Sequence, residues 1–553
     1  KDVTEIWVAD FETTTDENDC RVWGWAAAYV PDTDFVVMGT ELDEFFSWCQ
    51  RRKAQISFHN LAFDGTFILD WLFRNGYSHT TEKAARKGEF TTLISMQGQF
   101  YSLRVKFMNG NTVEFRDSLK KLPMPVSGIA KAFGTEEVKG EIDYHAHRPV
   151  GHELTPDERD YMRSDVVIVA KAMKVQLDQG MTRLTVGSDT LFEYRTLMGG
   201  KANFEMLFPV LPESMDADIR RAYKGGFTYA SPRFQGRHLG LGKVYDMNSI
   251  YPSVMYDEML PWGRPVFVDG LPEPTEEYPL FVTSITLTAK LKPDHIPCIQ
   301  VKGSPHFVAT HYQEHIAEPV TLFCTNVDLE LWEKHYDLDI LSYNGAYLFK
   351  ASTGFFQTFV DKWNAIKMNS EGGIRVLAKL HLNALYGKFA TNPNITGKVP
   401  WYKDGVVRLV MGEPETRDPV YTAMGVFITA YARKRTITAA QDHYDVFAYA
   451  DTDSLHLMCE DHPDDLDIDP SKLGAWKHEM DFSEAVYVRA KCYTERNIKT
   501  GQLETHIAGL PKQVAEQVTI HDMLHGATYT GKLLPVRVPG GIVLRDTTFE
   551  LTP

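Results

Sequence analysis

Apolar residues along this chain gather in short runs that end at acidic side chains. Two such runs, residues 446–449 and 455–458, flank Asp451 and Asp453. Short apolar segments on both sides of a polar turn predict a tight β-hairpin, here with two carboxylates at its tip. Two acids held together in apolar surroundings need a compensating positive charge, and carboxylate oxygens suit Mg²⁺. The alternative is a solvated turn in which aspartate only favours the turn geometry.

The N-terminal region shows a related arrangement. An apolar run at 6–11 predicts a buried strand on which Asp10 and Glu12, two residues apart, share one face. A second short strand is expected at 56–59, followed by a helix that opens at Asp64. Acidic side chains therefore lie at the ends of two neighbouring elements.

The sequence Thr-Pro-Asp-Glu at 155–158 is a capping box with proline at the first helical position, which predicts a helix start. On that helix Tyr161 and Asp165 are four residues apart and share a face. Four carboxylates then match the requirements of phosphodiester hydrolysis by two metal ions: Asp10, Glu12, Asp64 and Asp165. We expect Tyr161 to orient the attacking water. Each feature alone is also common on ordinary protein surfaces, so the prediction depends on their combination.

A third acidic strand is predicted further along the chain. Residues 244–246 form an apolar run that ends at Asp246, followed by a turn and a helix up to Leu260. Asp246 and the two hairpin acids would together complete a three-carboxylate metal site. Backbone N–H groups at the start of the helix can hold triphosphate oxygens.

A helix is expected from 374 to 389, with one apolar stripe that anchors it. A neighbouring stripe is polar and places four side chains in line: Arg375, Lys379, Asn383 and Tyr386. Such a row, with Lys367 just upstream, suits a triphosphate and a stacked base. The alternative is a solvated helix face.

Three further segments offer contacts for a nucleic acid. The sequence Ala-Tyr-Lys-Gly-Gly-Phe at 222–227 combines close backbone approach with stacking and charge, although a plain linker turn is the alternative. Thr429 and Arg433 share a helix face, and Lys491 and Tyr493 lie in an apolar-flanked segment. All four can donate to phosphates.

Composition indicates a globular protein of several domains, with 553 residues, 43% hydrophobic and 24% charged. No apolar run is long enough for a membrane span, and the N-terminal residues do not have the pattern of a signal peptide. The six cysteines form no CxxC pair, which favours a reducing compartment and argues against a zinc ribbon.

The net charge of −16 argues against nucleic-acid binding, which usually needs a basic surface. Six of the acids, however, lie in one segment, 460–469, which we expect to be a solvated loop remote from any binding groove. Global charge does not decide the local potential at a site.

Taken together, these motifs resemble those of family B DNA polymerases, preceded by an exonuclease of the DnaQ-like, RNase H-fold type. The polymerase-like motifs are DMNSIYP (246–252), KLHLNALYG (379–387), TAYAR (429–433), YADTDS (449–454) and KCY (491–493), with YKGGF (223–227) between the two halves. Four further segments are similar to the protein-primed phage polymerases of the phi-29 type: SLKKLP (118–123), IDYH (142–145), RPVG (148–151) and DPVYTAMGVFITAYAR (418–433).

The resemblance implies specific roles in the polymerase half. Asp246 and Asp453 would bind both metal ions, with Asp451 close by and Met247 assigned to the same metal and nucleotide site. Tyr251 would exclude a ribose 2′-OH. The remaining nucleotide-binding residues would be Lys367, Lys379, Asn383 and Tyr386. Primer–template DNA would contact Tyr223, Gly225, Gly226, Phe227, Thr429, Arg433, Lys491 and Tyr493.

In the exonuclease half the resemblance implies that the four N-terminal carboxylates bind metal, assisted by Tyr161 and Lys139. A frayed single-stranded 3′ end would be held by Thr13, His59, Asn60, Phe63, Ser118, Leu119 and Tyr144. Each of the two active sites would use two Mg²⁺ or Mn²⁺ ions.

The expected fold class is α+β and multidomain. The expected segments are a 3′–5′ exonuclease (1–186), a first palm segment (187–257), a first terminal-protein-region insertion (258–354), fingers (355–390), a second such insertion (391–422), a second palm segment (423–508) and a thumb (509–553). In the family, the second insertion encircles DNA.

The implied function is a protein-primed DNA-directed DNA polymerase with proofreading, strand displacement and high processivity. The implied partners are primer–template and single-stranded DNA, dNTPs and a terminal protein, with no membrane, for a monomer in the cytoplasm of an infected bacterium. One alternative is an exonuclease with a vestigial polymerase half, and another is a non-catalytic nucleic-acid scaffold. The intact acids at both sites argue against these two alternatives.

Overall fold

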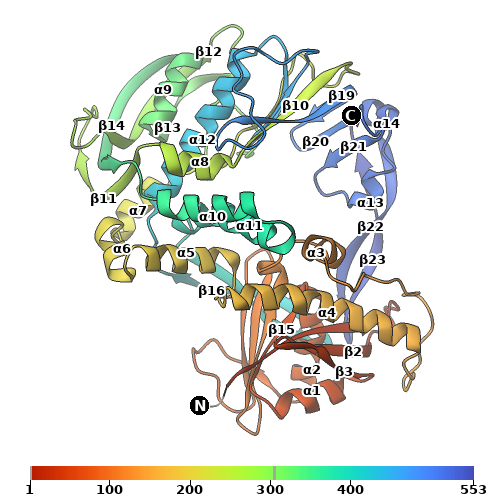
Figure 1. The fold of residues 1–553 in the computed structure, drawn as a ribbon. Coiled ribbons are helices and arrows are strands. Elements are labelled where there is room, and N and C mark those ends of the chain that lie inside the picture. The colour runs from red at the N-terminus through yellow and green to blue at the C-terminus, as the bar shows by residue number, and fades with distance from the viewer. Residues whose placement is uncertain (1–2, 303–306) are drawn as a thin grey trace.

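The structure is a computed structural model that describes residues 3–302 and 307–553. Its ribbon has a lower lobe built from the N-terminal region of the chain and a larger upper lobe built from the middle region (Figure 1). The C-terminal segment runs from the upper lobe back to the lower one (Figure 1). Among the described residues, no helix has both the length and the apolar character needed to cross a membrane.

The lower lobe contains an eight-stranded sheet in the order β3-β2-β1-β4-β8-β7-β6-β5. Its strands are β1 (Glu5–Thr13), β2 (Val22–Tyr29), β3 (Asp32–Gly39), β4 (Ala54–Phe58), β5 (Ser78–His79), β6 (Glu89–Ile94), β7 (Phe100–Lys106) and β8 (Thr112–Asp117). The helices are α1 (Leu42–Gln50), α2 (Leu61–Arg74), the 3-10 helix η1 (Ser118–Lys120), α3 (Val126–Phe133) and α4 (Pro156–Asp178).

Strand β1 is buried on both faces. Trp7 and Phe11 join the core that contains α1 and α2, whereas Val8 joins the core that contains α4. Because alternate residues share a face, Asp10 and Glu12 follow Val8 and lie toward α4.

The predicted helix start at Asp64 is wrong by three residues, since α2 begins at Leu61. Asn60 precedes it in the left-handed conformation, with φ of 78°. Asp64 therefore lies in the first turn of α2, where an acidic side chain is favoured by the helix dipole. The capping box at Thr155 is confirmed, with both of its hydrogen bonds present at the start of α4.

The upper lobe contains a seven-stranded sheet in the order β21-β20-β19-β10-β18-β17-β9. Its strands are β9 (Thr228–Ala230), β10 (Gly242–Met247), β17 (Phe447–Asp451), β18 (Ser454–Leu457), β19 (Trp476–Arg489), β20 (Cys492–Asn497) and β21 (Leu503–Ile507). The predicted acidic hairpin is confirmed as β17 and β18, with Thr452 in the left-handed conformation between them. Helices α8 (Ile250–Asp257) and α12 (Thr422–Asp442) accompany this sheet.

The helix predicted to reach Leu260 ends earlier, because α8 stops at Asp257 and Leu260 begins a strand. Pro261 follows Leu260 directly, and a residue before proline disfavours helical backbone. That strand, β11 (Leu260–Val268), belongs to a separate four-stranded sheet in the order β11-β14-β12-β13. The other elements are β12 (Leu280–Leu291), β13 (His315–Thr325), β14 (Tyr336–Ser352) and α9 (Asn326–His335). All of them lie within the segment expected to be the first insertion.

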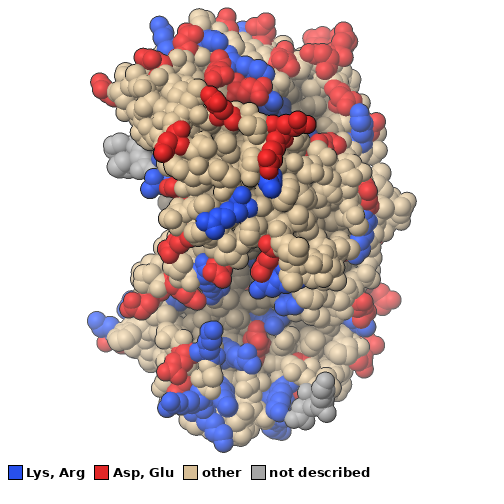
Figure 2. Space-filling view, turned by 90° about the vertical axis from the view of Figure 1, so that its left-hand side faces the viewer, with Lys and Arg blue, Asp and Glu red and all other residues tan. Residues whose placement is uncertain are grey.

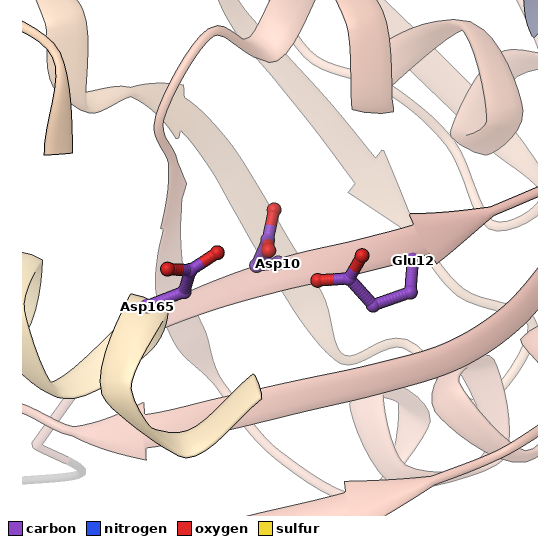
Figure 3. Close-up of side chains that lie close together, drawn as sticks. All are labelled: Asp10, Glu12 and Asp165. Atoms are coloured by element: carbon purple, nitrogen blue, oxygen red, sulfur yellow. The ribbon is translucent and has the colours of Figure 1, made fainter. Parts of the chain in front are cut away.

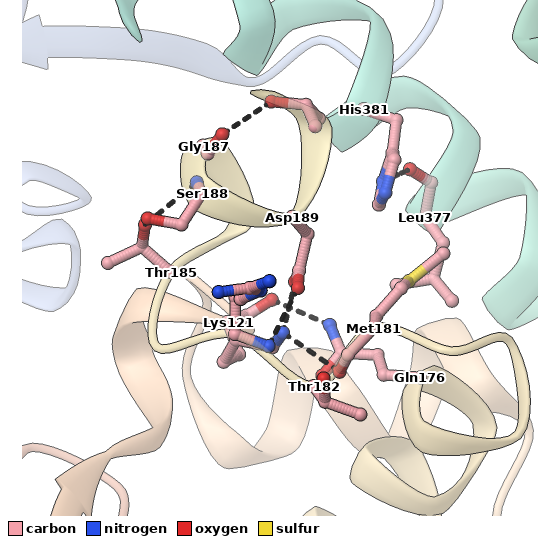
Figure 4. Close-up of polar contacts among 12 residues, drawn as sticks. Lys121, Gln176, Met181, Thr182, Thr185, Gly187, Ser188, Asp189, Leu377 and His381 are labelled. Carbon is pink, nitrogen blue, oxygen red and sulfur yellow. Dashed lines mark hydrogen bonds and ion pairs between the residues drawn. The ribbon is translucent and has the colours of Figure 1, made fainter. Parts of the chain in front are cut away.

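Helices α5 (Val186–Leu197), α10 (Gln357–Asn369) and α11 (Gly372–Phe389) lie between the lobes (Figure 1). Helices α6 (Lys201–Leu207) and α7 (Glu213–Arg220) pack against β11 and α12 of the upper lobe. The helix predicted over 374–389 is confirmed as α11. A buried ion pair between Lys121 of the lower lobe and Asp189 of α5 joins the two lobes (Figure 4).

Two hairpins contact the lower lobe. The first is β15 (Asn394–Lys403) with β16 (Val406–Thr416), whose Tyr402 ring stacks on Phe73 with centroids 5.2 Å apart. The second is β22 (Ala527–Val538) with β23 (Gly541–Leu551), which follows the short helices α13 (Lys512–Ala515) and α14 (Ile520–His525). Arg545 of this hairpin pairs with Glu17 at 2.7 Å. Both hairpins thus connect the upper lobe to the lower one.

Charged side chains are unevenly distributed over the surface. Figure 2 shows a face that is hollowed between the lobes, with Lys and Arg gathered on the lower lobe and around the hollow. Most acids of the segment 460–469 are exposed, as expected for a solvated loop. Local basic surface therefore coexists with the net charge of −16.

Candidate active sites

The lower lobe brings three of its four predicted carboxylates into one cluster. Asp10 and Glu12 come from β1 and Asp165 comes from α4, and one ligand atom of each lies within 4.8 Å of the other two (Figure 3). Gly24 is opposite Glu12 on β2, where a Cβ would lie 3.1 Å from Met162 of α4. The missing side chain at Gly24 thus permits α4 to approach β1 closely enough to complete the cluster.

The charges of this cluster are not balanced within the chain. Burial, reinforced by Asp165, raises the pKa of Asp10 to about 7. Burial and the neighbouring acids raise the pKa of Glu12 and of Asp64 well above their usual ranges. Grouped, poorly solvated carboxylates of this kind favour hard divalent cations. The donor set therefore fits Mg²⁺ or Mn²⁺.

Lys139 and two tyrosines border the cluster. The Nζ of Lys139 donates to both carboxylate oxygens of Asp165, at 3.1 and 3.0 Å, and to the hydroxyl of Tyr161 at 3.3 Å. Burial alone would lower the pKa of Lys139, but the pairing with Asp165 raises it overall. The hydroxyl groups of Tyr161 and Tyr144 are hydrogen-bonded to each other. Lys139 therefore remains a cation that holds Asp165 in place.

The cavity at this cluster is also lined by Thr13, His59 and Phe63, three residues predicted to hold a single-stranded end. His59 is fixed from both sides, because its ring nitrogens lie 2.8 Å from Ser118 Oγ and 2.6 Å from the Met124 carbonyl. The structure thus brings these predicted residues to one cavity beside the carboxylates.

Two contributions to this cavity were missed in the sequence. Buried Asp117 accepts hydrogen bonds from the backbone N–H groups of Asn60 and Leu119, each at 3.0 Å. The C-terminal hairpin also reaches the cavity, through residues that carry no recognisable motif: Leu533, Val543, Leu544 and Asp546. Only the folded arrangement reveals that this hairpin lies next to β1.

In the upper lobe, Asp246 and Asp451 lie on either side of Ser454 in neighbouring ladders of the sheet. Asp451 is already neutralised, since it pairs with Lys491 and accepts a hydrogen bond from Thr228 Oγ1 at 3.1 Å. Burial and Asp453 raise the pKa of Asp246 to about 7, and burial also raises the pKa of Asp453.

The three acids of the upper lobe are therefore not equivalent. Asp246 and Asp453 keep an unbalanced negative charge, which suits divalent cations, whereas the charge of Asp451 is offset by Lys491. Within residues 3–302 and 307–553, the lower-lobe cluster alone gathers three ligand atoms within 4.8 Å. The side chain of Met247 is buried, so this residue can offer only its backbone.

Opposite these acids lies the predicted nucleotide-binding row of α11. The rings of Tyr386 and Tyr251 are stacked, with centroids 4.0 Å apart. Lys367 Nζ lies 3.4 Å from Ser249 Oγ, and its pKa is lowered by burial and by Lys379. The Nδ2 of Asn383 donates a hydrogen bond to the carbonyl of Lys379 at 3.0 Å. Grouped cations of this kind are suited to binding a polyanion.

The glycine pair at 225–226 contacts the acidic hairpin. A Cβ on Gly226 would lie 2.4 Å from Thr452 Oγ1, whereas a Cβ on Gly225 would meet nothing within 4 Å. The Thr452 N–H donates to the Phe227 carbonyl at 2.7 Å, and the side chain of Phe227 is fully buried. Gly226 is therefore required for packing against the hairpin, and only the neighbouring backbone can face a ligand.

Thr429 and Arg433 do not reach the surface. Thr429 is 1% exposed and Arg433 is 5% exposed. Arg433 donates to the carbonyls of Lys224 and Gly225, at 2.8 and 3.1 Å, and to Asp328 at 2.9 Å. Arg433 thus supports the glycine pair from behind, whereas the Thr429 hydroxyl donates to the carbonyls of Gly425 and Val426 in its own helix, at 3.1 and 3.2 Å. In this structure neither side chain presents a donor to a phosphate. Tyr493 is also mostly enclosed, by the rings of Tyr449 and Tyr487 and of two histidines.

Comparisons with known proteins match the whole chain. A family model described as DNA polymerase type B, organellar and viral, matches residues 48–153 and 139–470. The chain is 42% identical over 571 residues to the DNA polymerase of Bacillus phage phi29, with 99% of each covered. It is 32% identical over 579 residues to the DNA polymerase of Streptococcus phage Cp-1, again with 99% of each covered.

Solved structures give the same result. Phi29 DNA polymerase complexed with primer-template DNA and incoming nucleotide substrates matches with a TM-score of 0.94 at 41% identity, covering 100% of both chains. The same polymerase complexed with single-stranded DNA matches with a TM-score of 0.94.

Proposed function

The chain belongs to the organellar and viral type B DNA polymerases, and from this premise we propose that it is a DNA-directed DNA polymerase with a 3′–5′ exonuclease. The template-directed reaction is assigned to the upper lobe and the degradation of 3′ ends to the lower lobe. The observation that carries the proposal is that the chain contains two separate acidic sites, each with poorly solvated carboxylates whose pKa is raised.

In the upper lobe, Asp246 and Asp453 would hold two divalent cations, together with the backbone of Met247. When bound, such ions lower the pKa of a primer 3′-OH and neutralise charge on the leaving pyrophosphate. The chain supplies the surroundings. Lys379 and Lys367 attract the triphosphate, and the stacked ring of Tyr386 offers a surface for a base pair.

Tyr251 is placed to act on the sugar of the nucleotide. Tyr251 lies in the first turn of α8, shortly after the strand β10 that carries Asp246, and its ring packs against Tyr386. We assign to it the steric exclusion of a ribose 2′-OH. Lys491 and Tyr493 belong to the primer side of the site, with Lys491 holding Asp451 until DNA is present.

In the lower lobe, Asp10, Glu12, Asp64 and Asp165 would bind the cations of the exonuclease. Lys139 fixes Asp165, and the hydrogen-bonded pair of Tyr144 and Tyr161 would orient water and the terminal phosphate. The unpaired 3′ end would lie in the cavity lined by Thr13, His59 and Phe63, supported by Asn60, Ser118 and Leu119.

The two hairpins would account for processive synthesis and strand displacement. The hairpin β15–β16 reaches the lower lobe through Tyr402, and β22–β23 reaches it through Arg545. Duplex DNA enclosed between such connections cannot leave without opening one of them. The domain limits proposed are those expected from the sequence, from the exonuclease at 1–186 to the thumb at 509–553.

The proposed partners are primer–template and single-stranded DNA, dNTPs and a terminal protein that supplies a side-chain hydroxyl as the acceptor of the first nucleotide. The DNA and nucleotide partners are proposed by analogy with phi29 DNA polymerase, whose solved complexes contain primer-template DNA, incoming nucleotides and single-stranded DNA. The terminal protein is proposed from the motifs shared with protein-primed phage polymerases. The protein would act as a monomer in the cytoplasm of an infected bacterium.

A primer-extension experiment tests the proposal. The purified chain is incubated with Mg²⁺ and a 5′-labelled primer on circular single-stranded DNA, with and without dNTPs. We expect products longer than one circle with dNTPs, and shortened primers without them. Shortening under both conditions would favour the alternative of a nuclease with a vestigial polymerase half.

A further inference from the structure

The sheet of the upper lobe contains a buried polar chain that the proposed reaction does not use. Glu495 of β20 lies with its Oε2 atom 2.6 Å from the Nδ1 atom of His456 on β18. The Nε2 atom of the same ring lies 3.2 Å from Ser454 Oγ. His456 and Glu495 are each 2% exposed. A buried carboxylate and imidazole are costly to retain unless their hydrogen bonds are satisfied.

Three tyrosine rings enclose this pair. The imidazole of His456 is nearly perpendicular to the rings of Tyr449, Tyr493 and Tyr487, with centroids 5.2, 5.3 and 5.8 Å away. The hydroxyl of Tyr487 also donates to Glu495 Oε2. The rings keep His456 and Glu495 out of bulk water, which strengthens the hydrogen bond between them.

The contacts determine how the imidazole is oriented. A carboxylate can only accept hydrogen bonds, so the Nδ1 atom of His456 must carry the proton that faces Glu495. The other ring nitrogen is thereby directed at Ser454. Glu495 thus fixes His456, and His456 in turn fixes the hydroxyl of Ser454.

Ser454 occupies the central position of a row across the sheet, between Asp246 and Asp451. It lies directly opposite Asp246 on β10 and directly opposite Asp451 on β17, and it follows Asp453 in the chain. Residues directly opposite each other in antiparallel strands share a face and have Cβ atoms about 4.5–5.5 Å apart. The position of Ser454 therefore sets the spacing between the carboxylates on either side of it.

We propose that Glu495 and His456 are positioning residues of the polymerase site, which hold Ser454 between Asp246 and Asp451 and so prepare the acids for divalent cations. Neither residue touches substrate. This inference rests on the proposed polymerase function, because it assigns the cations to Asp246 and Asp453. A purely structural role for the buried pair is the competing explanation.

Metal binding distinguishes the two explanations without any activity. Asp10→Ala and Asp64→Ala are introduced first, so that the exonuclease cations do not contribute. Binding of Mn²⁺ is then followed by the electron paramagnetic resonance signal of the free ion, in the absence of DNA and nucleotide. Glu495→Gln keeps the shape and an acceptor but removes the charge, and His456→Gln removes the imidazole.

We expect both substitutions to weaken Mn²⁺ binding about tenfold, as is typical when a group behind a metal ligand is lost. Tyr487→Phe is the matched control, because it removes the other donor to Glu495 but leaves the chain to Ser454 intact. Its Mn²⁺ affinity should stay within about twofold of the parent. With the exonuclease residues restored, Glu495→Gln should need more Mg²⁺ for half-maximal extension, while 3′ degradation is unchanged.

Three results would overturn the inference. The first is Mn²⁺ affinity unchanged in both variants while their melting temperatures fall, which would leave only a structural role. The second is tighter Mn²⁺ binding, which would mean that His456 acts as a repelling charge and not as a positioning group. The third is an equal change in the Mg²⁺ requirement of 3′ degradation. Absence of extension by the parent chain would instead contradict the proposed function, since Mn²⁺ binding remains measurable.

Discussion

Tyr251 and Tyr386 come from different helices and stack with ring centroids 4.0 Å apart and planes 20° apart. Tyr251 follows the strand β10, which carries Asp246. Tyr386 lies on α11, on the same polar face as Lys379. The pair thus joins the two sides of the proposed nucleotide site. Aromatic stacking of this kind is worth about 0.5–1.5 kcal/mol beyond the area buried, so an incoming nucleotide can displace it.

Shortening Tyr251 should relax the choice of sugar. In Tyr251→Val the ring that would meet a 2′-OH is gone, so we expect the preference for dNTPs over rNTPs to fall by about tenfold or more. The measurement is the ratio of kcat/KM for one matched dNTP and rNTP on the same primer–template. Tyr251→Phe keeps the ring and should keep the preference; an unchanged ratio in Tyr251→Val would exclude the assigned role.

Metal-dependent stability should vary with pH. The pKa of Asp10 and of Asp246 is raised from 3.8 to about 7 by burial and neighbouring acids, so the folded protein retains protons that the unfolded chain has lost. Without metal, these groups therefore make stability decrease as pH rises from about 4 to about 7. Cations bind the ionised carboxylates and should remove this loss.

Melting curves with EDTA and with Mg²⁺ measure this effect. The increase in melting temperature caused by Mg²⁺ should be small at about pH 5.5, grow through about pH 7 and then level off. Substituting Asp10→Asn and Asp246→Asn together should flatten the dependence. A Mg²⁺ effect of equal size at every pH would contradict the assigned protonation.

Gly226 should tolerate no side chain. In Gly226→Ala the new Cβ would lie 2.4 Å from Thr452 Oγ1, so the acidic hairpin has to move. Overpacking of this kind costs about 1–3 kcal/mol. Gly225→Ala is the matched control, because nothing lies within 4 Å of its Cβ. Denaturant unfolding of the two variants should separate them clearly, and equal stabilities would disprove the close packing.

Breaking the ion pair between Lys121 and Asp189 should loosen the junction of the lobes. Both side chains are buried, at 7% and 4% exposure, and Lys121 also donates to the Met181 carbonyl at 3.1 Å (Figure 4). Lys121→Met leaves a buried carboxylate without its cation, which typically costs about 3–5 kcal/mol.

The melting temperature of Lys121→Met gives the loss directly. The double substitution Lys121→Met with Asp189→Leu removes both charges and should recover much of the stability. If the single substitution were harmless, the junction would not depend on this pair.

Most of the strands and helices that carry the acidic residues could be predicted from the sequence. Apolar runs ending at Asp10, Asp246 and Asp451 predicted the correct strands because buried strands need continuous apolar residues and metal sites need carboxylates. The membership in a polymerase family, expected from the successive motifs, is confirmed by the family model and the phage relatives.

Contacts between residues far apart in the sequence could not be predicted. Nothing near Lys491 in the sequence indicates that it neutralises Asp451, because Lys491 lies in the turn between β19 and β20, 40 residues from Asp451. Arg433 looked like a phosphate donor by its residue type, yet the fold directs it at Asp328 and two carbonyls. The contribution of the C-terminal hairpin to the cavity beside Asp10 and Glu12 depends on how the lobes are joined, and local patterns carry no such information.

The central claim is that one chain contains two independent metal sites. Reciprocal substitutions test this claim most directly. Asp10→Ala with Asp64→Ala, and separately Asp246→Asn with Asp453→Asn, are compared on one 5′-labelled primer–template with Mg²⁺. The first variant should extend the primer and fail to shorten it without dNTPs, and the second should shorten it and fail to extend it. Loss of both activities in either variant would contradict two independent sites.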